Sequence, residues 1–208
     1  MKLVGMFDSP YVRRVAISMR LLDLPFEHLN WSIGKDQDKV KQYNPLGQVP
    51  ILVLDDGDTL VDSATILDYL DDRVGPDRAL VPRTGDARRH VLAATTLATG
   101  MADKARLQMY ELLFRPKELR HPPLTARLNA QMLATAAELD KLCARSTTPY
   151  LFGDRITQAD VSLGCAFTYA SETVKLTPPL PALRARAARI AELPAFQEIY
   201  LPFDAPVV

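Results

Sequence analysis

The chain has 208 residues, of which 48% are hydrophobic and 24% are charged, values ordinary for a soluble globular protein with one large domain or two small ones. Its 25 Lys and Arg residues balance 25 Asp and Glu residues, so nothing in the charge indicates nucleic-acid binding. No segment approaches the roughly 20 apolar residues of a membrane span, and the N-terminus lacks a signal-peptide core. We therefore expect a cytoplasmic protein that makes no membrane contact.

The first predicted elements are a strand and a helix joined by a polar turn. The apolar residues 3–7 predict a buried strand, and apolar positions at helical spacing predict a helix over residues 12–22. Pro10 suits the first helical turn, which makes Ser9 the expected N-cap. A hydroxyl at a helix N-terminus can hold an anion, although Ser-Pro begins many helices that have no chemical role.

Three more strands and two more helices are expected before residue 75. Residues 24–30 predict a short strand parallel to the first, and residues 36–43 a short charged helix. Apolar runs on both sides of an Asp-Gly turn predict a hairpin over residues 48–61, with Pro50 at the first position of its strand. Ser63 is the expected N-cap of the next amphipathic helix. The order β-α-β-α-β-β-α indicates an α/β domain.

The second part of the chain predicts only helices. Residues 75–85 break every periodicity and are interpreted as a linker. Long helices are expected over residues 86–118 and 124–145, and further helices begin at Thr157 and after Pro181 and Pro194.

One helix start in this part has a purely structural interpretation. Thr157 and Asp160 are spaced as a capping box, so we assign Asp160 no catalytic role. Cys143 and Cys165 are far apart in sequence and are expected in the core. They form no metal-ligand spacing, and the three His residues form no cluster, so no metal site is expected.

Four stretches, in this order, give the chain a resemblance to the cytosolic glutathione transferase superfamily over nearly its whole length. They are Ser9-Pro10-Tyr11-Val12-Arg13-Arg14, Asn44-Pro45-Leu46-Gly47-Gln48-Val49-Pro50, Asp62-Ser63, and Gly153-Asp154-Arg155-Ile156-Thr157-Gln158-Ala159-Asp160. Within the superfamily the chain is most similar to bacterial serine-type members near the beta and YibF-like groups. The resemblance implies an α/β thioredoxin-like domain over residues 1–75, a linker over 76–85, an all-α helical domain over 86–208, and a homodimer.

The resemblance also implies roles for individual residues in binding glutathione. Ser9 would hydrogen-bond the glutathione sulfur, and Val49 would bond the cysteinyl part through its main chain, with Pro50 in the cis form. Asp62 would take the α-amino group of the γ-glutamyl end, and Ser63 its carboxylate. Gln48 would lie beside that end, and Lys35 would pair with the glycyl carboxylate.

The chemistry of a thiol co-substrate agrees with these roles. A thiol with an ordinary pKa near 8.5 is mostly protonated at neutral pH, whereas the thiolate is the nucleophile. A helix N-terminus and one donated hydrogen bond both favour the anion. The adjacent carboxylate of Asp8 would oppose it, unless Asp8 points away or itself caps the helix.

The resemblance implies an enzyme whose glutathione thiolate attacks a small apolar electrophile, in a pocket lined by Phe7, Tyr11, Met101 and Tyr110. At helical spacing such residues are more often core than pocket. The same fold and co-substrate also serve isomerases, dehalogenases and peroxidases. Glutaredoxins carry Cys-Pro-Tyr-Cys where this chain has Ser9-Pro10-Tyr11-Val12, which argues against dithiol exchange. A non-catalytic interaction protein of the stringent-starvation type, which contacts RNA polymerase, is the alternative outside enzymes.

Overall fold

The computed structural model describes residues 1–174, 176 and 178–203, and the chain divides into two compact units. The first unit comprises Met1–Arg83 together with Pro194–Leu201. The second comprises Thr84–Leu193 together with Pro202 and Phe203. We expected all of residues 86–208 in the helical domain, whereas the structure groups residues 194–201 with the first unit.

A four-stranded mixed sheet forms the centre of the first unit. Its strands are β1 (Lys2–Val4), β2 (Glu27–Leu29), β3 (Ile51–Val53) and β4 (Thr59–Val61), in the spatial order β2-β1-β3-β4. β1 and β2 are parallel, as expected for two strands joined through a helix, and the β3–β4 hairpin is antiparallel. β3 is also antiparallel to β1.

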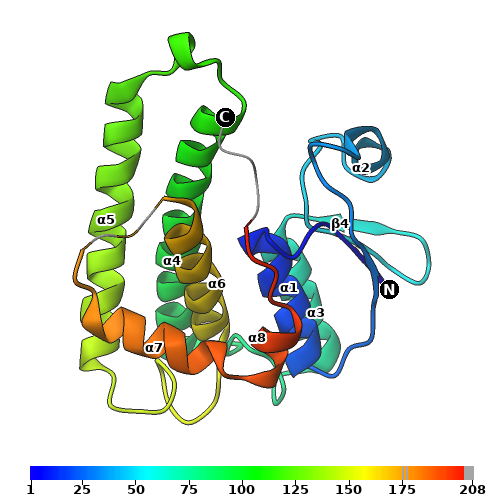
Figure 1. Cartoon of the computed structure of the whole chain (residues 1–208). Coiled ribbons are helices and arrows are strands. Elements are labelled where there is room, and N and C mark those ends of the chain that lie inside the picture. Colours follow the sequence, from blue (N-terminus) through cyan, green and yellow to red (C-terminus); the bar gives the residue numbers. More distant parts are fainter. Residues whose placement is uncertain (175, 177, 204–208) are drawn as a thin grey trace. The chain divides into compact units, whose positions relative to one another are not determined.

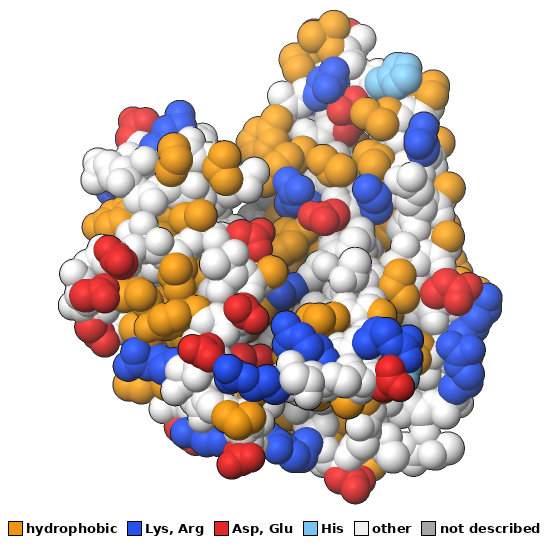
Figure 2. Space-filling view, turned by 180° about the vertical axis from the view of Figure 1, so that it is seen from behind, with side chains coloured by type: hydrophobic (Ala, Val, Ile, Leu, Met, Phe, Trp, Pro, Cys, Tyr) orange, Lys and Arg blue, Asp and Glu red, His pale blue; other side chains and the backbone are white. Residues whose placement is uncertain are grey.

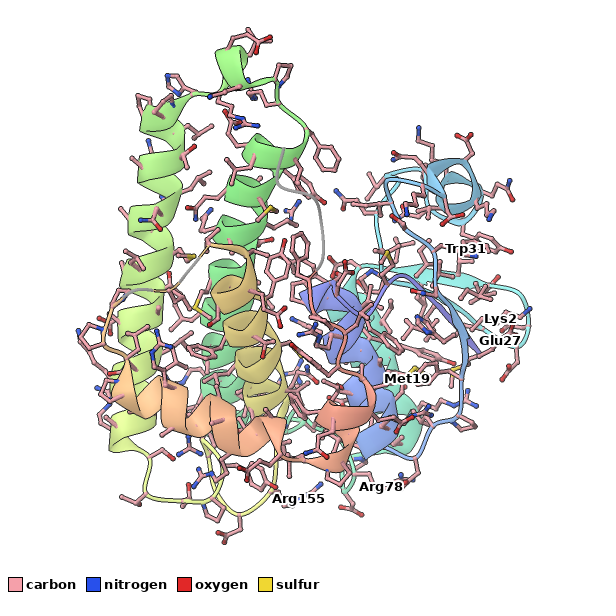
Figure 3. The ribbon with its side chains drawn as sticks, viewed as in Figure 1. Lys2, Met19, Glu27, Trp31, Arg78 and Arg155 are labelled. Atoms are coloured by element: carbon pink, nitrogen blue, oxygen red, sulfur yellow. The ribbon has the colours of Figure 1, made fainter. Side chains whose placement is uncertain are left out.

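Helices cover both faces of this sheet, as Figure 1 shows. They are α1 (Pro10–Leu21), α2 (Gln37–Tyr43) and α3 (Ser63–Val74). The short helix α8 (Pro194–Glu198) packs against α1. Successive strand residues point to opposite faces, and Val4 and Ile51 accordingly pack with Val40 of α2 on one face. α1 and α3 lie side by side on the other face. Trp31, labelled in Figure 3, packs against the cluster on the α2 side.

The second unit is helical throughout its described residues. It contains α4 (Gly85–Leu113), the short 3₁₀ helix η1 (Lys117–Leu119), α5 (Pro122–Arg145), α6 (Gln158–Thr173) and α7 (Pro181–Ala191). α4 packs against both α5 and α6, and α7 packs across one end of α5 and α6 (Figure 1). The predicted order of an α/β domain followed by an all-α domain is confirmed.

The described helices do not match a membrane-spanning helix in length and hydrophobicity. None of the described helices is both long and apolar enough to cross a membrane. On the face shown in Figure 2, acidic and basic side chains are interspersed with hydrophobic ones. This distribution matches the balanced composition of the sequence.

The first strand is shorter than its apolar pattern predicts. β1 ends at Val4 and not at Phe7, because Gly5 adopts a φ of 129° that extended L-residues do not use. The Gly5 N–H still donates to the Leu29 carbonyl at 3.0 Å. Residues 5–9 therefore form a loop that leads from the sheet to α1.

Candidate functional site

The strand register brings several loop segments to one edge of the sheet. Val4, at the end of β1, pairs with Leu29 at the end of β2 and with Ile51 at the start of β3. Ile51 in turn pairs with Val61 at the end of β4. The segments that follow β1, β2 and β4 and the segment that precedes β3 therefore meet this edge. We call the edge site the following set: Ser9, Val49, Pro50, Asp62 and Ser63.

Ser9 is the N-cap of α1, as predicted, with Pro10 at the first helical position. Its Oγ accepts the Val12 N–H at 3.5 Å, which is long for a hydrogen bond. The side chain of Ser9 is half-buried. The hydroxyl therefore stands at a helix N-terminus with only a weak capping bond, and Asp8 is not the helix cap.

Gly5 joins the start of α1 to the turn before β3. A Cβ atom built at Gly5 would lie 2.5 Å from the Val12 side chain and 2.9 Å from Val49 Cβ. Any side chain at this position would push the two segments apart. The sequence pattern placed Gly5 in the strand and did not indicate this role. Its positive φ distinguishes Gly5 from other glycines within apolar segments, and the pattern does not show φ.

The Val49–Pro50 peptide bond is cis, as the resemblance implied, and Pro50 directly precedes β3 instead of beginning it. The preceding turn is held by Asn44, whose side chain is 2% exposed. Asn44 Nδ2 donates to the Gln48 carbonyl at 2.8 Å, and its Oδ1 accepts the Leu46 N–H at 3.0 Å. The main-chain N–H and C=O of Val49 take no part in hydrogen bonds between the described residues. The side chain of Gln48 is exposed.

Asp62, and not Ser63 as expected, is the N-cap of α3. Its Oδ1 accepts the Ala64 N–H at 2.7 Å, and Ser63 is the first helical residue. Asp62 has a φ of 71°, a conformation that is uncommon outside glycine and is often found at functional sites. This backbone turns the exposed carboxylate over the first turn of the helix. Within the described residues, the Ser63 hydroxyl makes no hydrogen bond.

Lys35 lies on an exposed turn between β2 and α2. Its N–H donates to Ser32 Oγ at 3.4 Å. The neighbouring Lys39 hydrogen-bonds Asp36 at 2.8 Å and, together with the Ser32 N–H, lowers the pKa of the Asp36 carboxyl. Lys35 itself has no ion pair in the part of the chain that the structure describes. It remains a candidate for pairing with a carboxylate from outside the protein.

The four expected co-substrate residues are divided between the two units. In the first, Phe7 stacks on His28, and Tyr11 is half-buried on the first turn of α1. In the second, Met101 is completely buried in α4, which agrees with a core role. Tyr110 contacts Phe114 edge to face at 5.1 Å between ring centroids. A shared pocket stays a prediction.

Asp160 and both cysteines of the helical unit are buried. The capping box of Thr157 and Asp160 is present as predicted, and Asp160 is completely buried. Both cysteines are buried and neither forms a disulfide, and burial raises the pKa of the Cys143 thiol to about 11. Searched over its described residues, the chain has no group of three or more His, Cys, Asp or Glu side chains that could hold a metal ion.

Comparison with known proteins matches each of the two units to a domain of the same family. Residues 3–78 match the family described as Glutathione S-transferase, N-terminal domain, and residues 122–195 match Glutathione S-transferase, C-terminal domain. The chain is 30% identical over 205 residues to a maleylpyruvate isomerase from Ralstonia, and this match covers 95% of each chain. It is 29% identical over 170 residues to the uncharacterized GST-like protein YibF of Escherichia coli, which covers 81% of each.

A solved structure gives the same result. The crystal structure of a glutathione S-transferase from Methylobacterium radiotolerans, in complex with glutathione sulfonate, matches with a TM-score of 0.90 and 26% identity. The match covers 100% of this chain and 97% of that one. Both units therefore have counterparts within one solved chain.

Proposed function

Because this chain belongs to the glutathione S-transferase superfamily, we propose that its edge site binds glutathione and activates the thiol for attack on a small apolar electrophile. The observation that carries the proposal is the convergence of Ser9, Val49 and the Asp62–Ser63 helix start on one sheet edge. Glutathione has one amine, two carboxylates and one thiol. The edge site, together with Lys35 on the segment after β2, offers a complementary group for each of them. We also propose serine-type chemistry, with Ser9 at the sulfur, and a place near the YibF-like group, which the 29% identity to YibF supports.

The two ends of glutathione would be held by opposite charges. The Asp62 carboxylate caps Ala64 through Oδ1 and leaves Oδ2 for the α-amino group. The γ-glutamyl carboxylate would accept from the Ser63 hydroxyl and the N-terminal N–H groups of α3, where the helix dipole favours an anion. Gln48 would flank this end, and Lys35 would pair with the glycyl carboxylate. Val49 would hold the cysteinyl part through its main-chain N–H and C=O.

Thiol activation would depend on Ser9. Its hydroxyl would donate to the sulfur, and both that bond and the N-terminus of α1 stabilise the thiolate over the thiol. The thiol proton leaves to water. The thiolate then forms the new sulfur–carbon bond, while a leaving group such as chloride departs from the electrophile with its bonding electron pair. Phe7 and Tyr11, which belong to the same unit as Ser9, are the residues proposed to contact that electrophile. The protein contributes positioning and charge stabilisation.

Isomerisation is the second candidate, favoured by the similarity to maleylpyruvate isomerase over 95% of each chain. In that reaction the thiolate would add to the substrate and then be eliminated, so that glutathione is regenerated. Dehalogenation and peroxide reduction would use the same thiolate. A non-catalytic interaction protein would not need an intact edge site. We further propose that the protein is a cytoplasmic homodimer.

Calorimetric titration with glutathione tests the binding proposal. The native protein should bind, and Ser63→Ala should weaken binding by at least about tenfold, because a hydrogen bond to a charged group contributes roughly 1.5–3 kcal/mol. Thr65→Ala is the matched control, since Thr65 is exposed on the same helical turn. Absence of glutathione binding by the native protein would contradict the proposal.

A second assay separates conjugation from isomerisation. The protein is incubated with glutathione and either an activated chloronitrobenzene or maleylpyruvate. Conjugation consumes one free thiol for each product molecule, whereas isomerisation leaves the thiol concentration constant. Turnover without thiol loss would favour the isomerase, and turnover of neither substrate would leave glutathione binding as the function of the site.

A further inference from the structure

The loop Gly5–Ser9, which we call the Ser9 loop, is held at several of its main-chain groups. The Gly5 carbonyl lies 2.7 Å from His28 Nε2, which must donate because a carbonyl only accepts. The Met6 carbonyl accepts the Ser9 N–H at 3.2 Å, and the Phe7 carbonyl accepts from Arg13 Nε at 2.8 Å. Two side chains from outside the loop therefore fix its path between β1 and α1.

His28 contacts this loop at two points. It lies on β2 opposite Leu3 of β1, and its ring is half-buried. Besides the hydrogen bond to Gly5, its ring stacks on Phe7 with 3.8 Å between centroids and 2° between planes. Phe7 is two residues before Ser9. One side chain thus ties both the first and the middle residue of the loop to the sheet.

We propose that His28 is a positioning residue that aims the Ser9 hydroxyl at the glutathione sulfur; this inference rests on the proposed function. The capping bond of Ser9, at 3.5 Å, is too weak to fix the hydroxyl by itself. Its position therefore depends on the loop that precedes it. An error of about 1 Å in such a position can cost on the order of 100-fold in rate.

The glutathione-holding groups lie on other segments. Val49 precedes β3, and Asp62 and Ser63 follow β4, whereas the side-chain hydrogen bond and the ring stacking of His28 are both made to the Ser9 loop. Removing His28 should therefore impair thiol activation more than glutathione binding. A residue that only stabilises the fold would affect both together.

Three substitutions separate the two contacts of His28. His28→Ala removes both, His28→Gln keeps a hydrogen-bond donor, and His28→Phe keeps a ring to stack on Phe7. For His28→Ala we expect kcat to fall about 10–100-fold at neutral pH, a higher pKa of the bound thiol, and a glutathione Kd within about twofold of native. The Gln and Phe variants should lie between Ala and native.

Glu27→Ala is the matched control on the same strand. Glu27 is exposed, and its ion pair with Lys2 at 3.5 Å (both residues are labelled in Figure 3) lies away from the Ser9 loop. Its bound-thiol pKa and kcat should equal the native values. All variants are first compared with the native protein by circular dichroism and thermal melting.

Three outcomes decide the inference. Native values of kcat and thiol pKa in a folded His28→Ala protein would overturn it, and so would a Kd that rises in proportion to the loss of kcat. If His28→Ala does not fold, the Gln and Phe variants carry the same test, and native-like thiol pKa values in both would overturn it. Failure of the native protein to bind glutathione would instead reject the proposed function itself.

Discussion

Two helices in this molecule, α6 and α1, begin with a hydroxyl residue as N-cap, Thr157 and Ser9, but the protein's own groups satisfy the two starts to different extents. At α6, Asp160 is completely buried and its carboxylate accepts the Leu151 N–H at 2.8 Å, the Thr157 N–H at 3.0 Å and the Thr157 hydroxyl at 2.9 Å. At α1, the Ser9 hydroxyl is half-buried and makes a capping bond of 3.5 Å. The first start is closed by the protein's own groups, and the second is left accessible.

The difference shows why a capping residue alone does not identify a site. A buried polar group must be satisfied within the protein, and the α6 start meets this requirement with a full set of short bonds. The α1 start instead has one weak bond and lies at the sheet edge reached by Val49 and Asp62. What distinguishes a binding position is the convergence of several such groups from different segments.

The largest effect is expected from removing the Asp160 carboxylate at the start of α6. Asp160→Ala should lower the free energy of unfolding by about 3 kcal/mol or more, because one buried and two part-buried donors lose their acceptor. Urea unfolding followed by circular dichroism measures the change. Asp154→Ala, at an exposed position in the preceding loop, is the control and should change stability little. A native-like midpoint for Asp160→Ala would contradict the structural role of this start.

A comparison of thiols gives the next largest effect. Burial raises the pKa of Cys143 from 9.0 to about 11, so the thiolate fraction at neutral pH falls roughly a hundredfold. Iodoacetamide should therefore modify Cys143 at least about a hundredfold more slowly in the native protein than in urea, as peptide mass spectrometry would measure. Labelling at the same rate in both states would show that the helical interior does not suppress this thiolate.

A smaller effect is expected on stability when the accessible start is altered. Ser9→Ala should cost about 0.5 kcal/mol, the lower end of the range for N-cap residues, because its bond is long. Thr157→Ala should cost more, since it also removes a hydrogen bond to buried Asp160. Urea midpoints of the two variants measure the order, and a larger loss for Ser9→Ala would reverse the comparison.

Local patterns predicted most of the fold. Apolar periodicity gave the helices and strands, and the spacing of Thr157 and Asp160 gave the α6 capping box. The family resemblance gave the cis Pro50. Each of these features depends on a short stretch of sequence, so a single sequence was sufficient to predict it.

The remaining features depend on contacts between distant segments. Gly5 ends β1 because of its positive φ beside Val49, and an apolar pattern does not encode that approach. Asp62 replaces Ser63 as N-cap because its own backbone turns left-handed. His28 faces the Ser9 loop only through the β1–β2 register. Positions of this kind become visible once the segments are placed in space.

The position of residues 194–201 has a similar explanation. Arg13 of α1 donates to the Leu201 carbonyl and lies 5.4 Å from the Tyr200 ring, and Arg20 pairs with Glu198 at 2.8 Å. These contacts group the segment with the first unit. Nothing local in the sequence after Pro194 indicates them, since a helix there fits either unit.

The central claim is that Ser9, at the accessible helix start, stabilises the glutathione thiolate. It is tested most directly by titrating the bound thiol through thiolate absorbance, in the native protein and in Ser9→Ala. We predict a bound pKa below the ordinary thiol value near 8.5 in the native protein, and a value higher by roughly one unit or more in Ser9→Ala, because a hydrogen bond to a charged group contributes about 1.5–3 kcal/mol. At saturating glutathione, the pH profile of kcat/KM for the electrophile should move to higher pH by the same amount. Equal thiol pKa values in the two proteins would contradict the account and would leave Ser9 as a helix cap alone.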